Sequence, residues 1–174
     1  MSIEKKTLRI VGALFITATV ASVVGFQVVL SPILNDSNIV TAVAGNDTRT
    51  IIGVLIDAIN SVAVVAIAVL LFPIIRERNE ALASGYLASR IIESAILIVG
   101  HISLLSLVTV SQQFVKAGPD ASHYLALGTL LVAVSDWTFL LGPGIIFSIT
   151  ALILNRLLYK ANLVPRWLSA WGIG

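Results

Sequence analysis

The sequence predicts an all-α, polytopic transmembrane helix bundle, on two observations. Of its 174 residues, 57% are hydrophobic and 11% are charged, and the mean hydropathy is +1.00. A soluble domain carries about 25% charged residues, so this chain cannot cover itself with polar side chains. The apolar residues also form runs of membrane-spanning length. At about 20 residues a crossing, the length suits about four or five crossings, and we expect residues 1–174 to be a single integral-membrane domain.

The first predicted span covers residues 8–30; Lys5 and Lys6 precede it, and it carries no charge after Arg9. A basic start before an apolar run also fits a signal peptide, with the Ala-Val-Ala triplet at residues 42–44 as a cleavage-like site. However, the run exceeds the roughly 7–15 apolar residues of a signal peptide, and the triplet lies well beyond its end. A retained membrane anchor is therefore favoured.

The next two spans are separated by a short charged turn. A polar loop over residues 31–50 leads to the second predicted span, residues 51–72, which Pro73 ends. The third predicted span covers residues 81–110. A helix is expected for each, because hydrocarbon offers no partner for unpaired backbone groups.

The fourth predicted span covers residues 124–159, and Gly142-Pro143-Gly144 interrupts it. Either one long helix is kinked there, or two half-helices meet there. Broken membrane helices expose backbone groups that can bind ions, so the triplet is a candidate site. The alternative is a packing kink. Small residues on the first span, Ala18, Ala21, Ser22 and Gly25, predict close helix packing in a similar way.

Charge placement favours one net crossing for the fourth span and a cytoplasmic amino terminus. Basic residues concentrate on the cytoplasmic sides of membranes. In this orientation two of them, Arg49 and Lys116, lie outside, Arg90 lies within the membrane, and eight lie inside: Lys5, Lys6, Arg9, Arg76, Arg78, Arg156, Lys160 and Arg166. We therefore expect a multi-pass protein of a bacterial inner (plasma) membrane.

The last residues predict the start of a fifth helix. Residues 165–172 read Pro-Arg-Trp-Leu-Ser-Ala-Trp-Gly, and Trp167 and Trp171 suit the aromatic belt at a membrane interface. The sequence stops at Gly174, before such a helix could cross. We therefore expect a truncated product.

Polar side chains on the third span form the main candidate site. Tyr86, Arg90, Glu93 and His101 fall on one stripe of a helix, and the spacing of Arg90 and Glu93 allows an ion pair. Charges in hydrocarbon are paired, hydrated or functional. Either the pair orients the helix against its neighbours, or Arg90 holds an anionic group while Glu93 carries or gates a proton.

Three further polar residues extend this site. Asp57 and Asn60 share a face of the second span. Counted from the middle of each span, Asp57 and His101 fall at similar depths. Asp136 comes near the same level if the fourth span is one long helix, so the three could share one layer. Two carboxylates and an imidazole could relay protons or hold a cation. The sequence contains no cysteine and no metal-binding or cofactor-binding motif, so neither a bound metal nor a cofactor is predicted.

Two motifs resemble a known family. The third span reads Tyr86-Leu-Ala-Ser-Arg90-Ile-Ile-Glu93-Ser-Ala95, and Leu163-Val-Pro165-Arg166-Trp167-Leu168 follows later. With Asp57, they resemble an uncharacterised bacterial multi-pass membrane family, domain-of-unknown-function family 4386, along nearly the whole chain. The resemblance implies that the Arg-x-x-Glu and Pro-Arg-Trp residues are family positions, and that one or two helices follow them. It implies location and architecture, without a mechanism.

Together these features predict an integral membrane protein whose polar intramembrane core handles a proton, an ion or a small amphiphile. The alternative is a non-catalytic membrane subunit or scaffold that binds partner helices. Hydrolase and nucleotide-binding motifs do not occur, so hydrolytic or nucleotide-driven chemistry has no positive support. A third hypothesis is an intramembrane enzyme that acts on lipid. The basic residues are divided among short loops, which argues against nucleic-acid binding. The expected partners are the lipid bilayer, a lipid or small amphiphile, a second copy, or another membrane protein.

Overall fold

The computed structural model describes residues 3–118 and 121–161, and all its regular elements in these ranges are helical. Two of them, η1 and η3, are π-helical segments within longer helices. The elements are α1 (Ile3–Ser22), η1 (Val23–Leu30), α2 (Ser31–Leu34), α3 (Ile39–Ala44), α4 (Asp47–Arg76), α5 (Glu80–Ala117), α6 (Ser122–Phe139), η3 (Leu140–Ile146) and α7 (Phe147–Ala161). The predicted all-α bundle is confirmed.

These elements join into four long rods. The rods that are apolar and long enough to cross a membrane contain 30, 30, 38 and 35 residues: Lys5–Leu34, Asp47–Arg76, Glu80–Ala117 and Ser122–Arg156. At about 1.5 Å per residue, each exceeds the roughly 30 Å of a hydrocarbon core. Each rod also turns large apolar side chains outward, for example Val62, which is 70% exposed. Such a surface is stable against lipid and unstable against water.

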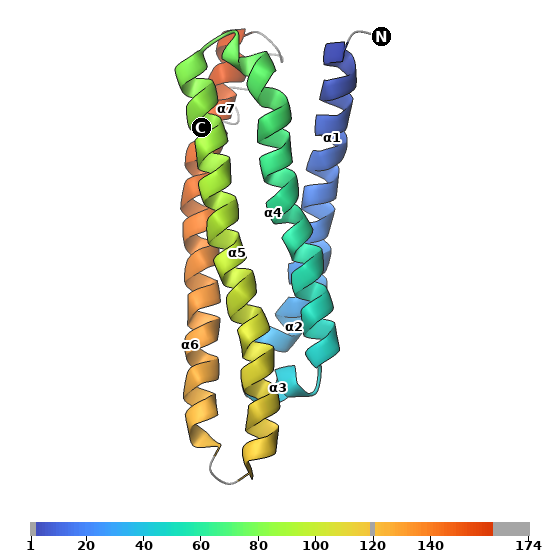
Figure 1. The fold of residues 1–174 in the computed structure, drawn as a ribbon, viewed down its shortest axis with the longest axis vertical. Coiled ribbons are helices and arrows are strands. Elements are labelled where there is room, and N and C mark those ends of the chain that lie inside the picture. Colours follow the sequence, from blue (N-terminus) through green and yellow to red (C-terminus); the bar gives the residue numbers. More distant parts are fainter. Residues whose placement is uncertain (1–2, 119–120, 162–174) are drawn as a thin grey trace.

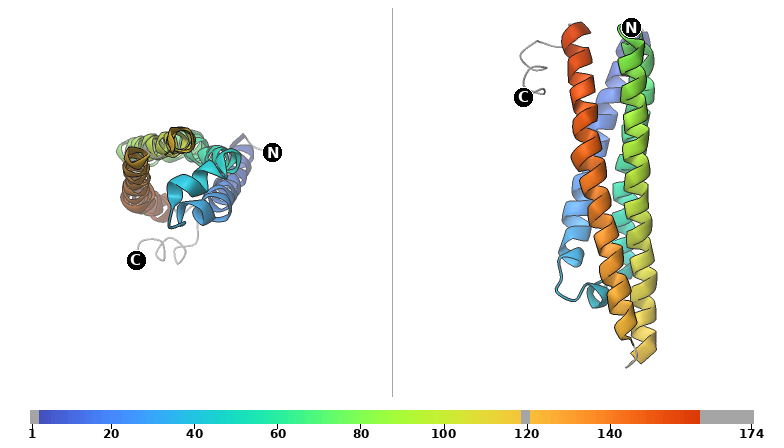
Figure 2. Two further views of the ribbon diagram at one scale, coloured as in Figure 1. Left: turned by 90° about the horizontal axis from the view of Figure 1, so that it is seen from below. Right: turned by 90° about the vertical axis from the view of Figure 1, so that its left-hand side faces the viewer.

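The rods run alternately up and down. The start of α1, the α4–α5 turn and the end of α7 lie at one end, and α2, α3, the end of α5 and the start of α6 lie at the other (Figure 1). Seen from the end, the rods follow one another around an arc, from α1 through α4 and α5 to α6 (Figure 2). The central rods, α4 and α5, therefore each have two neighbours, and their inner faces can carry a site shared by all four rods.

Small residues bring the rods close together. A Cβ atom on Gly25 would lie 2.6 Å from the backbone nitrogen of Asp57 and 2.8 Å from the carbonyl oxygen of Gly53. Ala18 and Ala21, on the same face of α1, are each 6% exposed. The close packing predicted for the first span is therefore present, and it places η1 directly against the backbone that carries Asp57.

The hydrophobic core consists of two clusters, one toward each end of the bundle. One includes Ile67, Ile75 and Tyr86. The other includes Leu30 and Leu107, with further apolar side chains of α3, α4 and α5. The buried charged side chains lie between these clusters along α4 and α5.

Two of the predicted helix boundaries were wrong. Pro73 does not end the second span, because α4 continues through it to Arg76. Ile75 is only 2% exposed, so packing holds the last turn in place despite the missing N–H. The third span also continues beyond residue 110, to Ala117. Gly118 follows with a φ of 62°, a left-handed conformation that favours glycine and ends a helix.

The predicted polar loop over residues 31–50 is largely helical. It contains α2, α3 and the first turn of α4, and Pro32 lies in the first turn of α2, where its missing N–H has no cost. Buried Val43 belongs to the cluster that joins α3 to α5 and the first rod, and the buried side chain of Val40 lies against Gly128 of α6.

The fourth rod is one continuous helix disturbed at the predicted triplet. Gly142-Pro143-Gly144 lies within η3, where the Phe147 N–H donates to the Gly142 carbonyl oxygen, five residues earlier. A proline cannot donate to the helix ladder, and the wider π-helical turn accommodates that loss. The predicted start of a fifth helix, residues 165–172, lies outside the described residues.

Candidate intramembrane binding site

The predicted pair on the third span is formed. Arg90 Nη1 donates to Glu93 Oε2 at 2.9 Å and to Oε1 at 3.2 Å, and the two residues are 3% and 4% exposed. The Arg90 guanidinium carbon lies 5.0 Å from the centre of the Phe147 ring and 5.7 Å from that of Tyr86. The guanidinium charge is therefore compensated by one carboxylate and contacted by two aromatic rings.

A second pair joins α4 to α5. His101 Nε2 and Asp57 Oδ2 are 2.8 Å apart, and both residues are more than nine-tenths buried. Asp57 and His101, which were predicted to lie at the same depth, are therefore in direct contact. The other ring nitrogen, His101 Nδ1, is buried without a hydrogen-bond partner among the described residues. Nearby along α5, Ser94 Oγ donates to the Ser61 carbonyl oxygen at 2.8 Å, which adds a second polar link between these rods.

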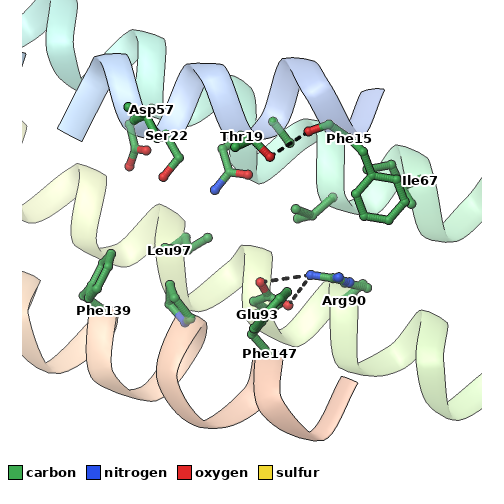
Figure 3. A pocket seen from close by; sticks show the side chains of 15 residues that line it. Phe15, Thr19, Ser22, Asp57, Ile67, Arg90, Glu93, Leu97, Phe139 and Phe147 are labelled. Atoms are coloured by element: carbon green, nitrogen blue, oxygen red, sulfur yellow. Dashed lines mark hydrogen bonds and ion pairs between the residues drawn. The ribbon is translucent and has the colours of Figure 1, made fainter. Parts of the chain in front are cut away.

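A cavity of about 420 Å³ lies at the centre of the four rods, and both pairs contribute to its wall. Asp57 and Asn60 line it from α4, and Arg90 and Glu93 line it from α5. In Figure 3, Asp57, Ser22 and Thr19 lie on one wall, across the space from Glu93, Phe139 and Phe147. Most of the remaining lining is aliphatic or aromatic. We call this cavity the central pocket.

A much smaller cavity lies on the other side of Asp57. Its volume is about 20 Å³, and its lining includes Asp57, His101, Ser135 and Thr138. A volume of about 10–15 Å³ is enough for one water molecule, so we call it the water-sized cavity. Asp57 lines both cavities. The Asp57–His101 pair therefore lies between them.

Asp136 does not join this layer, so its predicted placement was wrong. It is exposed on the outside of α6 and lines neither cavity. The reason is the rotation of α6: Ser135 and Thr138 face α5, where a Cβ on Gly100 would contact the Thr138 side chain. Depth along a span can be counted from the sequence, whereas the face depends on packing.

The helix-break triplet contributes packing and one wall residue. A Cβ on Gly142 would lie 3.4 Å from Ile96 Cγ2 and 3.6 Å from the Glu93 carbonyl oxygen, so this glycine allows η3 to approach α5 closely. Pro143 lines the central pocket, and Gly144 is exposed. These contacts agree with the packing interpretation of the triplet.

Several lining residues were not predicted. Thr19 and Ser22 of the first rod face the pocket, although the sequence indicated only close packing there. The aromatic residues Phe15, Phe139 and Phe147 also line it. Phe147 contacts Arg90 across two rods, and no local pattern could indicate this contact. For these unpredicted residues, the one signal in the sequence was the presence of small polar side chains, Thr19 and Ser22, within an apolar span.

The arrangement suits a small molecule that has an apolar part and a polar end. Ligand pockets typically occupy about 300–1,000 Å³ and combine an apolar lining with a few polar groups, as the central pocket does. Within residues 3–118 and 121–161, no three His, Asp or Glu side chains gather in the way a metal site would need.

The fold and the site define a four-span integral membrane protein with a charged interior. A family profile described as a domain of unknown function (DUF4386) matches residues 10–174. Because this match covers nearly the whole sequence, the chain belongs to that family. The comparison with curated proteins found no match. The comparison with solved structures found none either.

Proposed function

We propose that the central pocket binds a small amphiphile inside the membrane. The observation that carries this proposal is a cavity of about 420 Å³ that is lined by all four rods, with mostly apolar walls and with buried charged side chains contributed by α4 and α5. An apolar tail can lie against the aromatic walls while its head contacts the side chains of Asp57, Asn60 and Glu93. Binding energy comes from the apolar contact, and orientation comes from the polar end.

Photolabelling with an eight-carbon alcohol that carries a diazirine tests this proposal. The purified protein is reconstituted in lipid nanodiscs, irradiated and digested, and the labelled residues are located by mass spectrometry. We expect labelling of pocket-lining residues that saturates and that excess unlabelled octanol prevents. Labelling of lipid-facing residues is expected to rise in proportion to concentration.

Two valines on α4 provide a matched pair of variants. Val64 lines the pocket and is 7% exposed, whereas Val62 is 70% exposed on the outer face. Val64→Phe is expected to fill the pocket and abolish saturable labelling, and Val62→Phe is expected to leave it unchanged. Saturable labelling that survives Val64→Phe, or that never occurs in the wild type, contradicts amphiphile binding at this site.

We further propose that the chain is one integral-membrane domain of a bacterial inner membrane, with a cytoplasmic amino terminus. The distribution of basic residues supports this orientation. Among the described residues, those counted as cytoplasmic lie in the first turns of α1, near the α4–α5 turn or in α7, while Arg49 and Lys116 belong to the opposite end. A fluorescent protein that matures only in the cytoplasm, fused to the amino terminus, is expected to fluoresce. A dark fusion that is otherwise expressed contradicts this orientation.

A scaffold role is a second candidate, and one observation favours it. Asp136 is exposed on the outside of α6, beside Trp137, which is 64% exposed. A carboxylate facing lipid is costly, and a polar partner helix would reduce that cost. Stoichiometric co-purification of a membrane partner in mild detergent, lost in Asp136→Leu, would support this role. A single monodisperse species in both proteins argues against it.

A further inference from the structure

The charges around the central pocket restrict what its ligand can be. In the described part of the chain, the titratable residues that line the two cavities are Asp57, Arg90, Glu93 and His101, on α4 and α5. The other rods contribute only apolar and uncharged polar side chains to these walls. The opposite charges of Arg90 and Glu93, whose side chains are 2.9 Å apart, sum to zero. The net charge of the site therefore depends on Asp57 and His101.

The Asp57–His101 pair has two charge states that differ by one proton. With a protonated imidazole the pair is neutral overall, and the whole site carries no net charge. With a neutral imidazole that donates through Nε2, the pair and the site carry a single negative charge. Low-dielectric surroundings disfavour any uncompensated charge. The site is therefore neutral either with the extra proton or with a cation held against Asp57.

We propose that the central pocket takes an amphiphilic cation in exchange for one proton from the Asp57–His101 pair. This inference rests on the proposed amphiphile site and specifies its ligand. The cation enters beside the Asp57 carboxylate, and the imidazolium loses a proton to water, so the total charge is zero before and after. The bond that breaks is Nδ1–H of His101, while Nε2–H keeps its hydrogen bond to Asp57 Oδ2.

The geometry around His101 suits this exchange. Nδ1 is buried without a hydrogen-bond partner among the described residues, so a proton there is held by no acceptor. The water-sized cavity, which His101 lines together with the hydroxyl side chains of Ser135 and Thr138, has room for a proton acceptor. Asp57 touches both cavities. A ligand in one and a leaving proton in the other can therefore act on the same pair.

The walls also favour a cation. Phe15 and Phe139 line the central pocket and present aromatic rings, which attract positive charge. An anion would instead approach two carboxylates, Asp57 and Glu93. Its best partner would be the Nε of Arg90, which is buried without a partner in the described structure. That donor belongs to a guanidinium already paired with Glu93 and contacted by two rings.

Two ions of the same shape and opposite charge test the inference. Tetraphenylphosphonium and tetraphenylborate are each titrated against photolabelling of the pocket by the diazirine alcohol, in nanodiscs of neutral lipid. We expect the phosphonium to prevent labelling at a concentration at least tenfold lower than the borate. Because one proton leaves, the half-maximal phosphonium concentration should fall by about tenfold per pH unit while the pair is protonated, and level off at higher pH.

The variant His101→Gln distinguishes an effect of losing the proton from an effect of misfolding. Glutamine can still donate a hydrogen bond to Asp57 but does not titrate. At high pH this variant is expected to bind the phosphonium as the wild type does, which also shows that it is folded. At lower pH its affinity should stay constant. A pH slope that persists in His101→Gln overturns the assignment of the proton to this pair.

The remaining outcomes distinguish this inference from the proposed function. If the alcohol labels the pocket but the borate competes as well as the phosphonium, or neither ion competes, the cation inference is wrong and the amphiphile site stands. If the alcohol itself fails to label the pocket saturably, the proposed function is wrong, and the inference fails with it.

Discussion

The two buried pairs resemble each other in burial and differ in what holds them. Arg90 and Glu93 are three residues apart on α5, whereas Asp57 and His101 are 44 residues apart on α4 and α5. Formation of the first pair needs only a helix. Formation of the second needs two rods in register. The first is a fixed ion pair and the second can gain or lose a proton, so we assign anchoring to one and ligand-linked chemistry to the other.

Removing one member of the fixed pair is expected to have the largest effect. Glu93→Leu leaves the guanidinium of Arg90 buried without a counter-charge, which costs about 3–5 kcal/mol of unfolding free energy. The measurement is an SDS titration of the protein in mixed micelles. The double variant Arg90→Met/Glu93→Leu removes both charges and is expected to recover most of the loss. Equal losses in the single and double variants contradict a compensated buried pair.

Forcing η1 away from α4 should affect the inter-rod pair in particular. In Gly25→Ala the added Cβ would lie 2.6 Å from the backbone nitrogen of Asp57, and overpacking of this kind costs about 1–3 kcal/mol. We also expect weaker phosphonium binding, because Asp57 moves with its backbone. Gly12→Ala is the control, since nothing lies within 4 Å of its added Cβ, and it should be neutral or stabilising. Similar effects of the two changes would contradict the close packing.

The smallest expected effect is at the Ser94 link. Ser94→Ala removes a hydrogen bond to the Ser61 carbonyl oxygen on the neighbouring rod, and such bonds contribute about 0.6 kcal/mol on average in membranes. Ser106→Ala removes only a bond to Ile102 within the same helix and is expected to change the unfolding free energy less. The same mixed-micelle titration measures both, and a larger loss in Ser106→Ala would reverse the order predicted here.

The sequence alone predicted the features that depend on local residue spacing or on hydropathy. The four spans follow from apolar run length, and the Arg90–Glu93 pair follows from helical periodicity. The sequence did not predict how each rod is rotated about its axis. For that reason Asp136 was placed wrongly, and Asp57 and His101 were predicted to share a depth without being predicted to form a contact. The sequence also did not predict that Phe147 and Ser22 line the central pocket, because contacts between rods depend on all the side chains at each interface.

The central claim, that an inward-facing pocket favours positive charge, can be tested at one position. The chain has no cysteine, so Asn60→Cys introduces a single thiol into the pocket wall. Its rates of modification by trimethylammonium-ethyl and sulfonato-ethyl methanethiosulfonate are compared, each divided by the rate for free cysteine. We predict that the cationic reagent reacts several-fold faster after this correction and that tetraphenylphosphonium slows it. A thiol that reacts faster with the anionic reagent, or that the phosphonium does not protect, would contradict the account.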